Sequence, residues 1–468
     1  MVMSVQAIAG PGHGRTAGSS DDGRMQRRPN LIWFISDQQR GQSLSCMGDP
    51  DLSTPNFDRL GIQGLHFPNA VSCCPWCCPF RGSLITGLHA HRAVWQTPQR
   101  LDPALPTSVG ELAAAGYRSR YLGKWHLDGT PEPSHLHVVP RERRGGFDEW
   151  LAYENNNNQE DCWLHGHGED GREREPFRLD GFETDRLVDL AIERLEREAQ
   201  RRGGADERPF FLVISVQPPH NPYVAPAEDM ARHRPASVHL RPNVPPIAET
   251  QALARRELAG YHAQIENLDR NLGRLLAALD RLRLADDTWF MAFSDHGDMH
   301  HAHGYREKSV PYEEAIRIPF FLRGHRRHRT GRVPSVLSTV DIAPTSLGLC
   351  GLAKPAWMGG YDFSPWVTAP WNTASLPEEP ESAFLQHLPR KRHPYTLDRP
   401  WRGVVTRDGW KYACIPHAPL GLYDLNRDPY ELDNLAFKHA FIAERRRLHG
   451  MLTDWIQRTG DAFDLPDL

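Results

Sequence analysis

Four segments that predict strands, each followed by a polar or charged side chain, constrain the fold of this chain more than any other feature. Their apolar, β-branched and aromatic residues are typical of strands buried on both faces of a sheet. The segments are Leu31–Ile35 before Asp37, Tyr117–Leu122 before Lys124, Phe210–Val216 before His220, and Thr288–Phe293 before Asp295. One Asp after a strand often only caps a turn. Four polar strand ends instead favour a shared site, because ligands bind at the carboxyl ends of strands in open α/β sheets.

Amphipathic segments separate these strands. Apolar residues recur on one helical face over 184–198 and 261–282, and Ser108–Gly116 predicts a shorter helix ended by glycine. The 261–282 segment spans only about three heptads and leads into a strand, so a helix covering a sheet is favoured over a coiled coil. With a further strand at Ile316–Leu322, the pattern predicts an α/β fold with a large mixed, mostly parallel sheet between helices.

The chain divides into three regions by composition. Residues 1–28 are rich in Gly, Ser, Asp and Arg and predict a disordered tail, whereas 29–370 carries the strands and helices. In the region 371–468, proline-rich loops precede a predicted hairpin at Trp410–Leu425 and a terminal helix, which predicts a smaller α+β subdomain. The polar stretch Leu151–Asp180 predicts an irregular insertion, either over the active face or as a solvated loop.

Half of the eight cysteines crowd into one short stretch, Cys73-Cys74-Pro-Trp-Cys77-Cys78. This spacing is unlike a disulfide framework. Cys74 and Cys77 form a C-x-x-C pair, but no second pair is spaced for a structural zinc site. The residues after Cys77 predict a helix, which places this cysteine at a helix N-terminus, where backbone N–H groups favour an anion.

Charge and hydropathy exclude several classes of function. The formal net charge is −4, and no concentrated basic face indicates nucleic-acid binding. No apolar run has the length of a membrane span, and the short apolar piece near the N-terminus does not resemble a signal peptide. We therefore expect a cytoplasmic protein, with export as the alternative. Only six of the cationic residues are lysines, and Lys124 and Lys308 both lie near strand ends or polar motifs.

From about Pro29 to Leu435 the chain resembles the type I sulfatases of the alkaline phosphatase superfamily. The central motif is Cys77-x-Pro79-x-Arg81 followed by Leu84-x-Thr86-Gly87. The other motifs, in matching order, are Pro29–Arg40, Gly123–His126, Pro218–His220, Ser294–Asp298, Lys308 with Tyr312–Glu314, and Leu422–Leu425. The resemblance implies that 29–370 is a catalytic domain with an alkaline phosphatase-like sheet, and that 371–468 completes one rim of its site.

The resemblance also implies a cofactor, a modification and a set of ligands. Cys77 would be converted to formylglycine by a formylglycine-generating enzyme. Asp37, Gln38, Asp295 and His296 would bind a divalent cation together with residue 77, with Ca²⁺ expected and Mg²⁺ or Mn²⁺ as alternatives. Many sulfatases have a second Asp where this chain has Gln38. An amide oxygen can still coordinate a hard cation, but the site then carries one negative charge fewer.

The implied reaction is attack on sulfur by the hydrate of formylglycine, whose second hydroxyl then expels sulfate. Arg81 would position the hydrate and His126 would assist its deprotonation. Lys124 and Lys308 would neutralise the sulfate oxygens. His220, or Lys308, would protonate the departing alcohol.

The expected function is therefore hydrolysis of a sulfate monoester on a small-molecule, aryl or saccharide alcohol, and the polar loops favour a saccharide. The nearest alternative is a phosphonate monoester or phosphodiester hydrolase with the same site, which Gln38 makes credible. A non-catalytic thiol metal-binding protein centred on Cys73–Cys78 is the alternative from another class, but it leaves the four strand ends unexplained. The sequence predicts no oligomeric state.

Overall fold

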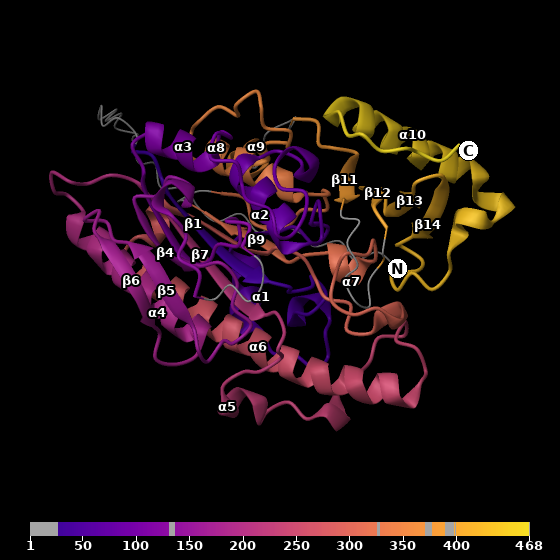
Figure 1. Cartoon of the computed structure of the whole chain (residues 1–468), viewed down its shortest axis with the longest axis horizontal. Coiled ribbons are helices and arrows are strands. Elements are labelled where there is room, and N and C mark those ends of the chain that lie inside the picture. Colours follow the sequence, from indigo (N-terminus) through magenta and orange to yellow (C-terminus); the bar gives the residue numbers. More distant parts are fainter. Residues whose placement is uncertain are drawn as a thin grey trace, which may run out of the picture.

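The protein, described from a computed structural model, is built around two sheets. The structure describes residues 27–130, 136–324, 328–369, 377–388, 397 and 399–467. The larger sheet has ten strands in the order β10-β2-β9-β8-β1-β7-β3-β4-β5-β6, and the smaller has four in the order β11-β12-β13-β14. Figure 1 shows the smaller sheet and the terminal helix α10 grouped at one end of the molecule. The predicted tail, apart from its last two residues, and the boundary expected near 370 lie outside the described residues.

The predicted strands form the centre of the larger sheet. Its strands are β1 (Asn30–Asp37), β2 (Leu65–His66), β3 (Arg118–Lys124), β4 (Glu149–Tyr153), β5 (Trp163–His167), β6 (Glu173–Arg178), β7 (Phe210–Pro219), β8 (Thr288–Ser294), β9 (Phe320–Arg323) and β10 (Gly331–Arg332). The central neighbours β8, β1, β7, β3 and β4 are parallel, whereas β9 runs antiparallel to β8 and β5 to β4. The prediction of a mixed, mostly parallel sheet is therefore confirmed.

Helices cover both faces of this sheet because its central strands are apolar on both sides. They are α1 (Pro55–Gln63), α2 (Cys77–Thr86), α3 (Ser108–Ala114), α4 (Glu183–Arg201), α5 (Ala227–Met230), α6 (Ala248–Arg281), α7 (Glu313–Ile316), α8 (Ile342–Leu349) and α9 (Ser364–Thr368). In β1, Trp33 packs in the core formed with α2, α3 and α8, while Phe34 packs in the core formed with α1, α4 and α6. Figure 1 shows these two helical layers on opposite sides of the sheet.

The segment Leu151–Asp180 corrects one prediction. It is not an irregular insertion, because β4, β5 and β6 form an antiparallel extension at the edge of the large sheet. His165 of β5 accepts a hydrogen bond from the backbone N–H of Val139 (2.8 Å). Most of β6 is exposed to solvent. An edge strand with solvent on its outer side needs no apolar alternation, so the sequence carried no strand signal there.

Two further boundaries differ from the sequence prediction. The strand expected at Ile316–Leu322 begins only at Phe320, because Ile316 ends the short helix α7. The C-terminal hairpin is half of a four-stranded antiparallel sheet formed by β11 (Ser382–His387), β12 (Trp401–Thr406), β13 (Trp410–Ile415) and β14 (Ala418–Asp424), against which α10 (Ile442–Thr459) packs. The first two strands were missed because proline-rich loops surround them.

None of the helices in the described ranges has the length and apolar character needed to span a bilayer.

A buried lysine connects the two sheets. Lys411 of β13 is 1% exposed, and its Nζ lies 3.1 Å from Glu313 Oε1 of α7 and also forms an ion pair with Glu431. Burial of these charges is tolerated only because they are paired. The pairing therefore fixes the C-terminal sheet against the large one.

Replacing Lys411 with alanine is expected to lower the free energy of unfolding by about 3–5 kcal/mol, because two buried carboxylates lose their shared cation. Denaturant unfolding measures the effect. The matched control is Lys438→Ala, since Lys438 pairs with Asp433 at the surface and its loss is expected to cost less than about 1 kcal/mol. Equal effects of the two substitutions would show that Lys411 does not stabilise the junction.

Candidate active site

The four predicted strand ends lie side by side in the fold. The strands that carry them are neighbours in the order β8-β1-β7-β3 and are mutually parallel. Asp37 ends β1 and Lys124 ends β3, while Asp295 follows β8 and His220 follows β7. Parallel strands present their carboxyl ends at one edge, so residues up to 258 positions apart form one buried cluster.

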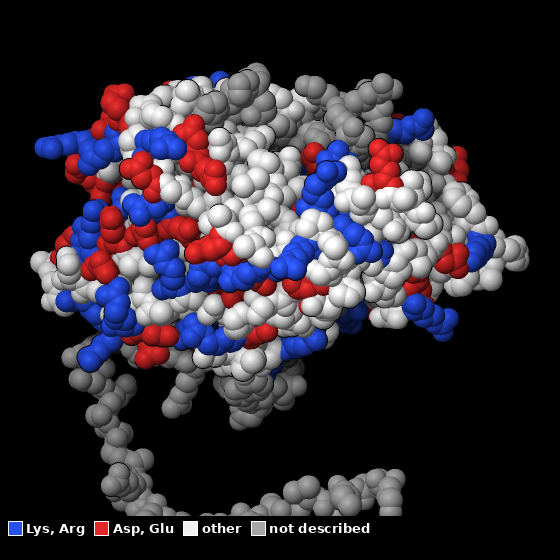
Figure 2. Space-filling view, turned by 90° about the horizontal axis from the view of Figure 1, so that it is seen from below, with Lys and Arg blue, Asp and Glu red and all other residues white. Residues whose placement is uncertain are grey.

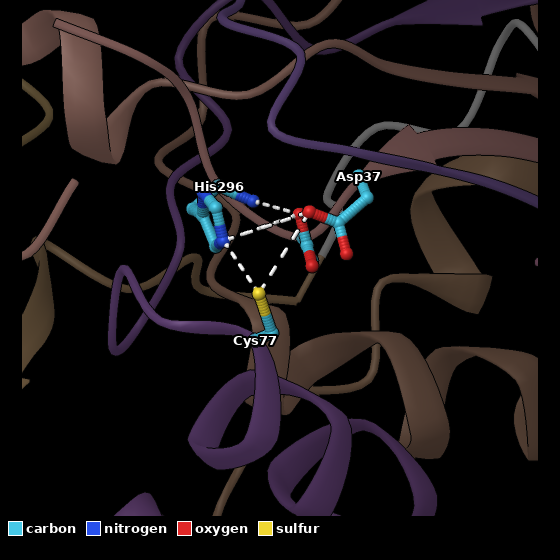
Figure 3. Close-up of side chains that lie close together, drawn as sticks. Asp37, Cys77 and His296 are labelled. Carbon is cyan, nitrogen blue, oxygen red and sulfur yellow. Dashed lines mark hydrogen bonds and ion pairs between the residues drawn. The ribbon is translucent and has the colours of Figure 1, made fainter. Parts of the chain in front are cut away.

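Cys77 is the first residue of α2, as the sequence predicted. Its Sγ lies 3.3 Å from His296 Nε2, 3.3 Å from Lys308 Nζ and 3.7 Å from Asp37 Oδ1. Figure 3 shows the cysteine at the end of its helix, pointing at His296 and Asp37. Here Sγ stands in for the hydroxyl oxygens that a hydrated aldehyde would carry. An anion at this position lies against the positive end of the α2 dipole.

Asp37, Cys77, Asp295 and His296 form a group that fits a metal ion. Their ligand atoms lie within 4.8 Å of one another, and all four residues are buried. Asp295 Oδ2 accepts no hydrogen bond from the described residues and lies 3.6 Å from Arg81 Nη2. His296 Nδ1 lies 2.9 Å from the carbonyl of Gly297 and donates to it, which leaves the Nε2 lone pair directed at the cluster.

The pKa values of Asp37 and Asp295 are also those expected of residues that bind a metal ion. Burial and the charge of Asp37 raise the pKa of Asp295 to about 7. Burial would also raise the pKa of Asp37, but the charges of Lys124, Lys308 and Arg81 outweigh it and hold that pKa well below its usual value. A divalent cation beside both groups would stabilise both as carboxylates.

Gln38 lies at the edge of this group with its amide already bonded. Its Oε1 accepts a hydrogen bond from Lys308 Nζ (2.8 Å), and its Nε2 donates to Asp298 Oδ2 (2.6 Å). Its backbone has a positive φ of 69°. The amide oxygen predicted to bind a metal is thus a partner of Lys308 in this structure.

The predicted cations Arg81 and Lys124 both contact Asp37. Lys124 Nζ lies 2.8 Å from Asp37 Oδ2 and is fully buried. Arg81 Nη2 lies 3.1 Å from the same oxygen, while its Nη1 donates to the Lys124 carbonyl and to Ser215 Oγ, both at 2.8 Å. Arg81 therefore fixes Asp37 and the end of β3, whereas Lys308 contacts the cysteine itself.

The two predicted histidines are held neutral. His220 Nδ1 donates to the carbonyl of Asn221 (2.7 Å), and its Nε2 lies 3.0 Å from Lys308 Nζ, from which it accepts. Burial and the charge of Lys308 lower the pKa of His220 well below its usual value. Burial and the charge of Lys124 do the same for His126. Of this pair, Lys308 is therefore the protonated partner and His220 the neutral one.

Sequence reasoning missed several residues that hold these groups. Ser215 accepts from Arg81, and Tyr121 donates its hydroxyl to the Lys124 carbonyl. Asp298 and Tyr223 are joined by a 2.7 Å hydrogen bond next to Gln38. A polar Ser215 inside the apolar β7 run was the one signal in the sequence. Asp298 belonged to a quoted motif but had been given no role.

Of the four clustered cysteines, only Cys77 belongs to the metal-competent group. Cys73 and Cys74 pack in a separate apolar cluster with Ala90 and Val340. Burial raises the pKa of Cys73 to about 11, and that of Cys78 above its usual value. Protonated, separately packed thiols do not form a thiolate metal site.

Comparison with known proteins agrees with this geometry. The sulfatase family model matches residues 29–352, and a model described as the C-terminal part of N-sulphoglucosamine sulphohydrolase matches 301–458. An ulvan-active sulfatase from Formosa agariphila is 32% identical over 94% of this chain and 83% of its own. An endo-4-O-sulfatase from Bacteroides thetaiotaomicron is 27% identical over 87% of this chain and 88% of its own.

A solved structure gives the same result for the fold. A Bacteroides thetaiotaomicron protein from its metabolism of multiple glycosaminoglycans superimposes with a TM-score of 0.80 at 25% identity, covering 93% of this chain and 97% of the other. The sulfatase family model spans the large sheet and the Cys77 helix, and the second model spans most of the C-terminal region. The chain belongs to the sulfatase family and is a sulfuric ester hydrolase with the fold of the alkaline phosphatase superfamily.

Proposed function

We propose that this enzyme hydrolyses a sulfate ester of a saccharide, with Cys77 converted to formylglycine and a divalent cation bound beside it. One observation carries the proposal: Cys77 Sγ lies at the N-terminus of a buried helix, 3.3 Å from both His296 Nε2 and Lys308 Nζ. A nucleophile is thus surrounded by metal ligands on one side and by a cation on the other. Maturation requires a formylglycine-generating enzyme as partner.

The cation would be held by Asp37, Asp295, His296 and residue 77, with Ca²⁺ expected and Mg²⁺ or Mn²⁺ as alternatives. When bound, it supplies Lewis acidity to the sulfate oxygens and to the hydrated aldehyde. Two carboxylates favour a hard cation. Gln38 contributes no charge and shares its oxygen with Lys308.

The side chains around residue 77 bind the sulfate group and assist its transfer. Lys308 is close enough to contact a sulfate oxygen there, and Lys124 adds a second positive charge behind Asp37. In a buried site such fixed charges stabilise the negative charge that develops in the transition state. His126, neutral because burial and Lys124 lower its pKa, is suited to accept a proton from the nucleophile.

Lys308 and His220 form the acid that protonates the leaving alcohol. Burial would lower the pKa of Lys308, but Cys77 and Asp37 raise it above its usual value. Because His220 Nε2 accepts from Lys308 Nζ (3.0 Å) and His220 Nδ1 donates to the Asn221 carbonyl, the ammonium of Lys308 is the group that donates the proton to the alcohol oxygen, and the neutral imidazole positions it. Removing the side chain of Lys308 or His220 is expected to lower kcat most for substrates whose alcohol is a poor leaving group.

An amide-rich segment beside His220 favours a saccharide as the alcohol. Gln159 Nε2 donates to the His220 carbonyl (3.1 Å), and Gln217 Nε2 donates to Asn155 Oδ1 (3.3 Å) and Asn157 Oδ1 (3.2 Å). Carboxamides pair well with sugar hydroxyls because they both donate and accept. The ulvan-active and endo-4-O-sulfatase relatives support the same class.

The enzyme is expected to show a kcat/KM at least about tenfold higher on an aryl sulfate than on an aryl phosphonate monoester. The experiment uses protein produced together with a formylglycine-generating enzyme and assayed with Ca²⁺, and compares both substrates in one buffer. The Cys77→Ala variant is the control and should lose both rates. A preference for the phosphonate would replace the sulfatase proposal by the phosphonate hydrolase that Gln38 allows.

A further inference from the structure

A cleft apart from the catalytic centre has five arginines among its lining residues. It has a volume of about 810 Å³ and lies between the loop after β1, the segment before α6 and the C-terminal sheet. Its lining includes Arg40, Arg241, Arg317, Arg332 and Arg407 but only two carboxylates, Asp49 and Glu313. None of the residues assigned above to metal binding or catalysis lines it. Figure 2 shows Lys and Arg side chains interspersed with Asp and Glu side chains on the face seen from below.

Two of these arginines lack a counterion. Arg40 is only 4% exposed, yet it forms no ion pair with a described carboxylate: its Nε donates to Ser43 Oγ (2.7 Å) and its guanidinium lies 5.9 Å from the Tyr261 ring centroid. Arg332 is exposed, contacts Met47 Sδ (3.6 Å) and likewise forms no ion pair within the described part of the chain. A buried guanidinium without an ion pair is costly, so Arg40 favours an incoming anion, and the exposed Arg332 is free to contact it.

The other three arginines are partly neutralised. Arg241 pairs with Glu314 (2.8 Å), Arg407 pairs with Glu379 (2.6 Å), and Arg317 pairs with Glu313. The cleft thus keeps net positive charge in a chain whose formal net charge is −4. Positive potential inside a hollow surface concentrates anions.

The chemistry of the lining identifies the kind of anion. Guanidinium groups bind the planar or tetrahedral oxygens of carboxylate and sulfate through paired hydrogen bonds. The Tyr430 ring lies 4.7 Å from the Arg241 guanidinium, and Asn69 and Asn426 add amides to the wall. Aromatic and amide groups beside a cation suit a charged sugar, and the volume lies within the range of small-ligand sites, about 300–1,000 Å³.

We propose that this arginine cleft is a second saccharide-binding site, which holds a sulfate or carboxylate group of the saccharide chain away from the ester that is hydrolysed. The proposal rests on the proposed function for its ligand class. Its residues and its test are independent of the catalytic centre. Binding there would anchor a polymeric substrate to the enzyme and raise the local concentration of its sulfate esters.

The test measures binding of ulvan and heparin oligosaccharides by calorimetry to the Cys77→Ala protein, which cannot turn them over. Adding Arg332→Gln and Arg407→Gln is expected to weaken the Kd of a bound oligosaccharide at least about fivefold and to flatten its salt dependence. The matched control pair is Arg172→Gln with Arg174→Gln, which also combines a weakly paired and a paired arginine but lies at β6, away from the cleft. This control should leave the Kd unchanged. If the Arg332→Gln and Arg407→Gln double variant has a lowered melting temperature, the single variant Arg332→Gln replaces it in the binding measurement.

Three results would overturn the proposal: no oligosaccharide binding to the parent protein, equal binding by both double variants, or inorganic sulfate binding as tightly as the oligosaccharides. The last result would indicate a site for the free ion. With Cys77 intact, kcat/KM on an aryl sulfate should stay within about twofold in the cleft variant, because a small substrate does not reach the cleft. An inactive parent enzyme would instead count against the proposed function and leave the binding result standing.

Discussion

Replacement of Cys77 with alanine is expected to lower kcat on an aryl sulfate by at least about 10⁴-fold, the size of loss seen when a catalytic nucleophile is removed. The substitution removes the one side chain that lies between His296 Nε2 and Lys308 Nζ. It leaves the α2 helix and its packing in place, so the melting temperature should change little. Steady-state kinetics and thermal unfolding measure the two effects.

Cys78→Ala is the matched control for this prediction. Cys78 is the next residue of the same helix and is equally buried, but it packs in the hydrophobic core and faces no metal ligand. Activity should be retained, with a modest loss of stability. Mass spectrometry of the peptide Pro75–Arg81 should show an aldehyde or its hydrate at residue 77 in the parent protein. An unmodified thiol in a fully active enzyme would contradict the formylglycine mechanism.

Asp295→Asn is expected to lower kcat/KM at least about 100-fold and to abolish the stabilisation of the protein by Ca²⁺. The reason is that Asp295 contributes a carboxylate oxygen that accepts no described hydrogen bond within the group of metal-competent side chains. In the parent protein, Ca²⁺ at about 100 times its Kd should stabilise the fold by about 2.7 kcal/mol. Thermal unfolding with and without Ca²⁺ measures this difference.

Asp341→Asn supplies the control, because burial also raises the pKa of Asp341 to about 7. This carboxylate accepts from the backbone N–H groups of Ser338 (2.7 Å) and Tyr361 (2.6 Å) and does not belong to the metal-competent group. Its replacement should lower stability and leave the Ca²⁺ response intact. A Ca²⁺-dependent shift that survives Asp295→Asn would place the metal elsewhere.

The central strands were predictable because both of their faces are buried. Leu31–Ile35 and Thr288–Phe293 carry continuous apolar runs for this reason, and the residues that follow them, Asp37 and Asp295, mark the site. The edge strand β6 was not predictable, because most of its residues face solvent and its sequence resembles that of a loop. Its neighbour β5 is buried but includes the polar residues His165 and His167, which gave no apolar strand pattern.

In the site, the sequence likewise predicted which residues take part but not which side chains contact one another. Residue types and their order along the chain identified Cys77, Lys124, His220 and Lys308 as one group. Their pairings were not accessible from the sequence, since Gln38 contacts Asp298 and Lys308, which lie 260 and 270 positions away in the chain.

By itself, the sequence determined the family, the order of the central strands and the main helices, and the residues at the strand ends, because these depend on local patterns and on short motifs. Only the tertiary structure decided what each charge contacts. It assigned Arg81 to Asp37 and the Gln38 oxygen to Lys308, and it placed Arg40 in a separate cleft, where it forms no ion pair among the described residues. Such contacts join segments distant in the chain, and burial then sets their strength through desolvation, which no local pattern encodes.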